Sequence, residues 1–166
     1  QQISQYLEQV DKQMTQIRVV SGLTRAEANA MVGTAVKAAS ALRTTTAEYL
    51  QAQQVYYQQG LSNSEVTARS QATIKAANIS GQDVATTAEQ VTAVLNGFKI
   101  PASEINTTLS AMASLGAQTA TDFEELATAS QKVASAASNA NIPLNNTLAM
   151  LATMSSVTRE SAESIG

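Results

Sequence analysis

The stretch from Thr121 to Val157 reads TDFEELATASQKVASAASNANIPLNNTLAMLATMSSV and has the pattern of two helices joined by a short turn. Thr121 is a suitable helix cap, Glu124 follows three residues later, and apolar residues then recur at helical spacing. The asparagines at 139 and 141 interrupt that pattern, and Pro143 has the fixed φ that suits the first turn of a second helix, which carries leucines on one face. The stretch therefore predicts a helical hairpin.

The same start signal recurs upstream at intervals of about 20 residues. In each case a Ser or Thr precedes an acidic residue by three positions, which is the pattern of a capping box. In that motif the hydroxyl accepts a hydrogen bond from a backbone amide, and the carboxylate bonds back to the amide of the cap. We expect helix caps at Thr24 with Glu27, Thr45 with Glu48, Ser62 with Glu65, Ser80 with Asp83, and Thr121 with Glu124.

Between these starts the apolar residues keep helical spacing, and no stretch alternates apolar and polar residues as a strand does. The sequence predicts an all-α fold, a compact array of about seven to eight short amphipathic helices joined by short loops, without a β-sheet. Gly116 is expected to end a helix and Thr158 to begin the last one, while the helix from about 62 to 78 has a weak apolar face and is expected at an exposed edge. The residues expected in the core are Val84, Val91, Leu95, Phe98, Leu109, Met112, Phe123, Leu126, Val133, Leu148 and Leu151.

The first twenty residues have a pattern of their own. Ile3, Leu7, Val10, Met14 and Ile17 follow one another at spacings of four, three, four and three, which is a heptad-like seam on a Gln-rich helix. We expect residues 1–21 to form a lead-in helix that continues an upstream coiled coil, and residues 22–166 to form a helical domain. Because the chain begins without a methionine, we also expect it to be a fragment of a longer protein.

Composition excludes several kinds of chemistry. The 166-residue chain contains no Cys and no His, so it has no disulfide, no thiolate metal site and no histidine base for a Ser or Thr nucleophile. Charged residues make up only 14% of the chain and the formal net charge is −3, so we expect neither sequence-specific nucleic-acid binding nor attraction to an anionic membrane. No apolar run is long enough to span a bilayer.

Most of the acidic residues have a structural explanation, because nine of the thirteen fall in the first turns of expected helices, where they favour the helix dipole. Glu124 and Glu125 would form a catalytic pair only if another acid converged on them. The scattered glycines do not form a phosphate-binding loop. We therefore expect no catalytic, cofactor-binding or metal-binding residues, no cofactor and no enzymatic activity.

The order of these blocks resembles the core region of tail tape measure proteins of long-tailed bacteriophages, also called phage minor tail proteins. The resemblance covers residues 22–166 and is carried by GLTRAEANAMV, LRTTTAEYLQAQQVYYQQGLSNSEV, ATTAEQVTAVLNGFKIPASEI and the block from Thr119 to Gly166. In this family the last block has an acidic helix start, an Ala-rich helix, a short loop and a leucine-bearing helix. The family's loop commonly carries a glycine where this chain has asparagines, and Asn also accepts a left-handed conformation.

The resemblance implies a structural protein of the virion tail, assembled in the host cytoplasm, that helps to set tail length and is expelled before DNA during genome ejection. It implies tail tube, tail-tip or baseplate proteins and tail assembly chaperones as partners, with self-association as a further possibility. Two alternatives act by protein–protein interaction: a bacterial signalling or adaptor domain, which would need longer heptads, and a helical-repeat scaffold, for which only residues 45–80 and 121–156 resemble each other loosely.

Overall fold

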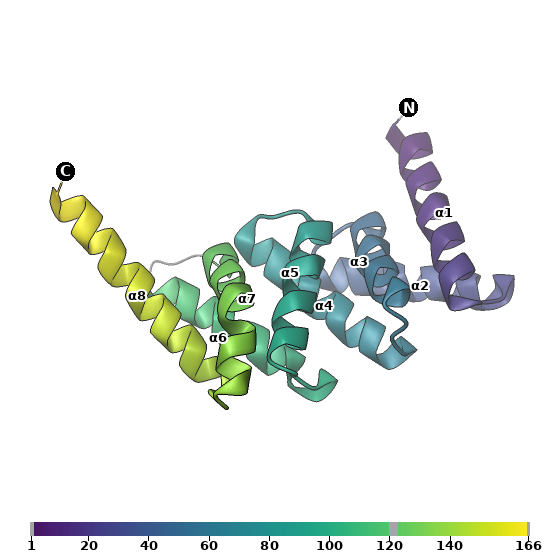
Figure 1. The fold of residues 1–166 in the computed structure, drawn as a ribbon. Helices are drawn as coiled ribbons and strands as arrows, with labels where there is room; N and C mark the ends of the chain where they lie inside the picture. The colour runs from purple at the N-terminus through teal and green to yellow at the C-terminus, as the bar shows by residue number, and fades with distance from the viewer. Residues whose placement is uncertain (1, 120–122, 166) are drawn as a thin grey trace. The chain divides into compact units, whose positions relative to one another are not determined.

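The computed structural model describes residues 2–119 and 123–165, and the side chains of these residues except 102, 113–119, 123–124 and 155–165. Within these limits the chain forms eight α-helices and one short 3-10 helix, and it contains no β-strand (Figure 1). The all-α class is therefore confirmed. The helices group into two compact units, one of residues 1–77 with 83–88 and the other of residues 78–82 with 89–166.

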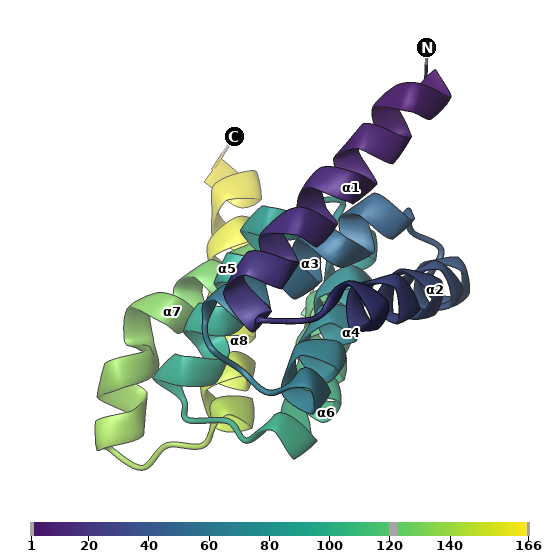
Figure 2. The ribbon, with the colours of Figure 1, turned by 90° about the vertical axis from the view of Figure 1, so that its right-hand side faces the viewer.

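The first unit is built around α3 (Thr46–Gln58). Both α1 (Gln2–Ser21) and α2 (Arg25–Leu42) pack against α3, and they diverge from the short loop that joins them (Figure 2). Tyr49, Leu50 and Tyr56 of α3 are fully buried, and they form the centre of a core that also includes residues of α4 (Asn63–Ser80) and the start of α5 (Val84–Gly97).

The seam on α1 is only partly covered in this unit. Met14 and Ile17 are buried, whereas Leu7 is 60% exposed and Ile3 is 78% exposed. The C-terminal half of the seam therefore belongs to the core of the first unit, together with α3. A separate lead-in segment over residues 1–21 and an upstream coiled coil stay predictions.

The expectation that the fourth helix lies at an exposed edge is wrong. Val66 and Ile74 of α4 are fully buried, and so are the polar residues Ser70 and Thr73 between them. The helix lacks a clear apolar stripe because part of the face that it buries is polar. Apolar periodicity therefore underestimated its contacts.

The second unit contains the rest of α5, the 3-10 helix η1 (Ala102–Glu104), α6 (Ile105–Thr119), α7 (Phe123–Asn139) and α8 (Leu144–Ile165). Each of α6, α7 and α8 packs against the other two. The largest fully buried side chains in the described part of this unit are Leu95, Ile105, Met112, Leu126 and Leu148. Buried alanines from α7 and α8, such as Ala127, Ala134 and Ala152, fill the spaces between them.

The predicted core residues take three kinds of position. Phe98 lies just past the end of α5 and is half-buried, and Val133 and Leu151 are half-buried at the margins of the buried stripes of α7 and α8. The side chain of Phe123 lies outside the described residues. The buried members are Val84, Val91, Leu95, Leu109, Met112, Leu126 and Leu148.

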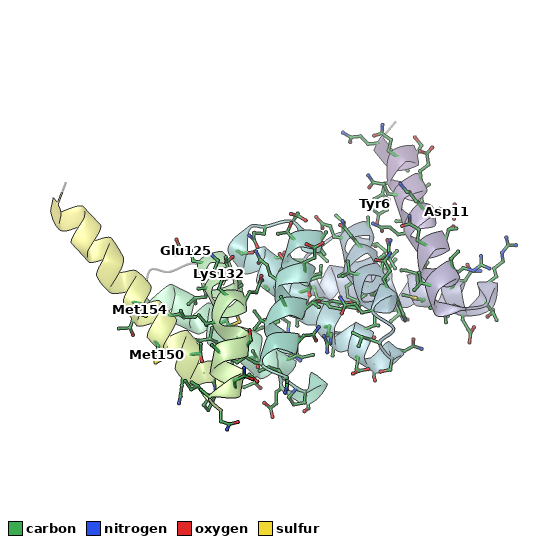
Figure 3. All side chains as sticks on the ribbon, in the orientation of Figure 1. Tyr6, Asp11, Glu125, Lys132, Met150 and Met154 are labelled. Atoms are coloured by element: carbon green, nitrogen blue, oxygen red, sulfur yellow. The ribbon has the colours of Figure 1, made fainter. Side chains whose placement is uncertain are left out.

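Two expected helix boundaries in the second unit are wrong. Gly116 lies inside α6, because a single glycine weakens a helix by about 1 kcal/mol without ending it. No helix begins at Thr158, because α8 continues through that residue to Ile165. Met154 of α8 follows Leu151 by three residues, at helical spacing, but is 65% exposed (Figure 3).

A shared turn ends three of the helices. Arg43, Lys99 and Asn141 have φ values of 56°, 55° and 54°, which place them in the left-handed region. After each of them, the next amide donates to a carbonyl five residues back, which satisfies one of the orphan acceptors of the helix end. These bonds are Thr44 N to Ala39 O at 3.0 Å, Ile100 N to Leu95 O at 2.8 Å and Ile142 N to Ala137 O at 2.8 Å.

Two of these turns also share their sequence. Lys99 and Asn141 are each followed by Ile and then Pro, so α5 with α6 and α7 with α8 are connected in the same way. Proline suits this place because it cannot continue the preceding helix and its fixed φ favours the start of the next. The second unit therefore contains two helix pairs with equivalent turns.

A close approach at Gly97 joins α5 to α7. A Cβ added to Gly97 would lie 2.5 Å from the Cβ of Ala134, which is closer than real Cβ atoms come to one another. The two helices can therefore meet at this point only because one residue lacks a side chain and the other has a single methyl group.

We expect Gly97→Ala to lower the free energy of unfolding by about 1–3 kcal/mol, which is the usual cost of forcing a methyl group into a packed interior. The matched control is Gly33→Ala, because Gly33 lies inside α2 with open space around its Cβ position. That change should be neutral or stabilise the protein by up to about 1 kcal/mol. Urea unfolding followed by circular dichroism measures both, and a Gly97→Ala variant as stable as the parent would contradict the close approach.

Candidate functional site

Among the side chains that the structure describes, no group of three or more acidic residues lies close enough together to hold a metal ion. Among the described helices, none combines the length and apolar character needed to cross a membrane. The candidate functional feature is therefore the set of helix surfaces that the caps and turns position.

The first two predicted caps form complete capping boxes. The Oγ1 atom of Thr24 accepts from the amide of Glu27 at 3.3 Å, and the amide of Thr24 donates to Glu27 Oε2 at 2.8 Å. Thr45 and Glu48 repeat the arrangement at 3.1 Å and 3.0 Å. Two orphan amides at each helix start are thus satisfied locally.

These hydrogen bonds also favour the ionised carboxylates. The hydroxyl of Thr44 donates to Glu48 Oε2 at 2.6 Å and is the main cause of the lowered pKa of Glu48. The pKa of Glu27 is lowered mainly by the backbone amide of Thr24. In both cases the carboxylate is already ionised at neutral pH and accepts hydrogen bonds, so it has the properties of a cap rather than of a general acid.

In the third predicted cap, Ser62 with Glu65, the carboxylate of Glu65 accepts the hydrogen bonds. The amide and the hydroxyl of Ser62 both donate to Glu65 Oε2, at 3.1 Å and 2.7 Å. The hydroxyl of Ser62 is the main cause of the lowered pKa of Glu65. This pair lies at the start of α4.

The predicted pairing of Ser80 with Asp83 is wrong. Ser80 belongs to the end of α4, and Gly81 follows it with a left-handed φ of 71°. Asp83 is itself the cap of α5, since its Oδ1 accepts from the amide of Thr86 at 2.9 Å and its Oδ2 accepts from the hydroxyl of Thr86 at 2.6 Å. The hydroxyl of Thr86 is also the main cause of the lowered pKa of Asp83. Asp is an efficient cap without a partner, so the Ser-x-x-Asp spacing was misleading here.

The fifth predicted cap cannot be placed. Thr121 and the side chain of Glu124 lie outside the described residues. Glu125 is exposed on α7, as is Lys132 two turns later (Figure 3).

A buried polar contact in the first unit was not predicted from the sequence. The hydroxyls of Tyr56 and Thr73 are hydrogen-bonded at 2.5 Å, and Tyr56 also donates to the carbonyl of Ala88 at 3.5 Å. This contact joins α3, α4 and α5. The sequence supported only a general expectation, namely that a buried tyrosine hydroxyl usually finds a hydrogen-bond partner.

The other two tyrosines of α3 are also held at specific places. Tyr57 donates to Asn63 Oδ1 at 3.1 Å, and burial raises its pKa. Burial likewise raises the pKa of Tyr49, which is hydrogen-bonded to the side chain of Gln71. The phenol groups therefore link α3 to α4 rather than forming an exposed stacking surface.

The hairpin predicted between 121 and 157 is present in its described part. The helix α7 ends at Asn139, Asn141 makes the left-handed turn, and α8 begins at Leu144. The carbonyl of Pro143 accepts from the amides of Asn146 and Thr147, both at 3.1 Å, so Pro143 lies at the cap position, just before the first turn.

Comparison of the sequence with known protein families gives a match. The family model described as phage-related minor tail protein matches residues 34–166. The chain belongs to this family. No curated protein and no solved structure gives a significant match.

Membership of the phage-related minor tail protein family indicates a structural role in a phage tail, a location in the virion tail and contacts with other tail components. The matched region begins within α2 and includes all three left-handed turns at Arg43, Lys99 and Asn141. The helix α1 lies before it. The part shared with the family is therefore the series of helix pairs, not the lead-in helix.

We expect Asp83→Ala to lower the free energy of unfolding by about 1 kcal/mol, because it removes the acceptor for the amide of Thr86. Ser80→Ala is the control and should have the smaller effect, because Ser80 lies at the end of α4 and the amide of Thr86 at the start of α5 donates to Asp83 instead. Urea unfolding of the two variants side by side measures the difference. The assignment of the cap fails if Ser80→Ala is the more damaging change.

Proposed function

We propose that this minor tail protein chain is part of a tape measure protein, the long molecule inside the tail tube of a long-tailed phage. In this role it helps to set tail length during assembly and is expelled before DNA during genome ejection. The observation that carries the proposal is the order of elements in α7 and α8: an Ala-rich helix, an asparagine turn and a leucine-bearing helix, all within the family match.

The packing of the second unit supports a role that needs rearrangement. Several buried positions between its helices are alanines, and Gly97 meets Ala134 without any intervening side chain. A buried alanine removes much less apolar surface from water than a buried leucine, so each such contact contributes little to stability. Helices held in this way can separate at low cost and reform, which suits passage through a narrow tube.

Weak charge supports the same proposal. With charged residues at 14% of the chain, the surface carries little long-range field, so it would attract DNA only weakly as the genome follows. We propose tail tube, tail-tip or baseplate proteins and tail assembly chaperones as partners, assembly in the host cytoplasm, and no enzymatic function. Self-association and a lead-in role for residues 1–21 belong to the same proposal.

A change in chain length tests the proposal directly. Duplicating residues 102–143 in the phage gene adds one segment that begins after Pro101 and ends at the equivalent Pro143, so both junctions keep the native turn. If the added segment is helical in the tail, it should lengthen the tail by roughly 60 Å at 1.5 Å per residue. Electron microscopy of negatively stained virions measures the length.

The control is Ile79→Ser, which alters an exposed side chain without changing chain length and should leave tail length unaltered. Intact tails of normal length that contain the duplicated protein would rule out a ruler function. The chain would then be better explained as a helical-repeat scaffold in the tail, an alternative favoured by the two equivalent turns at Lys99 and Asn141.

A further inference from the structure

A groove of about 550 Å³ lies between α1 and α2 in the first unit. Its apolar surface comes from Leu7, Val10 and Met14 of α1 and from Val32 of α2, and its charged lining includes Arg18 and Arg25. Met14 is buried, whereas the other five residues are half-buried or exposed. The groove is thus partly apolar and open along one side of α1.

The apolar part of the groove continues a packed interface. On α1 the seam residues Met14 and Ile17 are buried in the core with α3, and the same seam runs on through Val10 to the exposed Leu7. Apolar residues recur every three or four positions along α1, as they do in a coiled coil. A second helix packed alongside α1 would therefore insert its side chains between the apolar residues that α1 leaves uncovered. The geometry favours a helix over an extended segment as the occupant.

The charged part of the groove lacks a partner. The Nε atom of Arg18 is buried and has no hydrogen-bond acceptor in the described chain, which is costly for a charged donor. Arg25 lies nearby at the start of α2, and the groove contains one carboxylate, Asp11 (Figure 3). Two guanidinium groups against one carboxylate leave the groove with a net positive charge, so it is complementary to an acidic residue.

We propose that this groove binds an amphipathic helix of another protein. The bound helix places apolar side chains at heptad spacing over Leu7, Val10 and Val32, and it directs a Glu or Asp carboxylate to the guanidinium group of Arg18. This interaction is independent of the tape measure proposal, because it uses α1 and the start of α2, both before the family match at residue 34.

A pair of synthetic peptides tests the proposed chemistry. Each is a fluorescein-labelled helix of three heptads with Ala at a and Leu at d; one carries Glu at e and g, and the other carries Lys there. Fluorescence anisotropy with the 166-residue chain gives the dissociation constants. We expect the Glu peptide to bind at least about tenfold more tightly than the Lys peptide, since a carboxylate pairs with a guanidinium group and a second cation is repelled by it.

Variants of the chain locate the contact. Leu7→Ser and Arg18→Gln should each weaken binding of the Glu peptide about tenfold, and Arg18→Glu should reverse the preference in favour of the Lys peptide. Val19→Ser is the matched control, because Val19 is 80% exposed on the same helix but does not line the groove. Circular dichroism confirms that each variant is folded, and Leu7→Ala, which keeps a good helix former at that position, replaces Leu7→Ser if that variant is not.

Three results would overturn the proposal: no measurable binding of the Glu peptide, equal affinity for the two peptides, or equal loss of binding in Val19→Ser. A fourth comes from sedimentation equilibrium without peptide. If the chain self-associates and Leu7→Ser abolishes this, a second copy occupies the groove and the proposed partner is wrong.

Discussion

The left-handed turn at the end of a helix is the feature on which the rest of this structure depends. Residues with positive φ follow α1, α2, α3, α4, α5 and α7, and they are glycine at three of these places and Arg43, Lys99 and Asn141 at the others. A non-glycine residue in this conformation costs about 1–2 kcal/mol. The hydrogen bonds that follow offset that cost by satisfying carbonyls that the helix leaves open. Without these turns, a chain rich in Ala and Gln would favour long helices over helix pairs.

The packing follows from the same chemistry. Short helices with few large side chains form a core only if they approach closely, as Gly97 and Ala134 show, or if buried polar groups find one another, as Tyr56 and Thr73 do. Capping boxes at Thr24 and Thr45 stabilise each helix locally. Part of the stability therefore comes from within single helices and their turns, in addition to the packing of the core. The proposed tape measure role, in which the chain is compact at one stage and extended at another, would benefit from such local stabilisation.

Much of this fold could be predicted from the sequence because its determinants are local. The caps at Thr24 and Thr45, the break before Pro143 and the leucines of the last helix are all readable from spacing alone. Contacts between helices were harder to predict. The sequence gives no sign that Thr73 would meet Tyr56, so α4 was wrongly expected at an edge. The start of α5 was misjudged because Ser80 and Asp83 have the spacing of a capping box, whereas Gly81 ends one helix and Asp83 begins the next. The resemblance to the family was visible in the order of blocks, since no single residue has a diagnostic chemistry, and the family-model match over residues 34–166 established membership.

Pulling on single molecules tests most directly whether the helices are stabilised locally by caps and turns. Optical tweezers attached to the two ends of the 166-residue chain would record extension as force rises and falls. We predict several reversible steps, each releasing one helix or helix pair, with refolding on relaxation. A single cooperative rupture that releases the whole chain at once, without refolding as the force falls, would contradict the account.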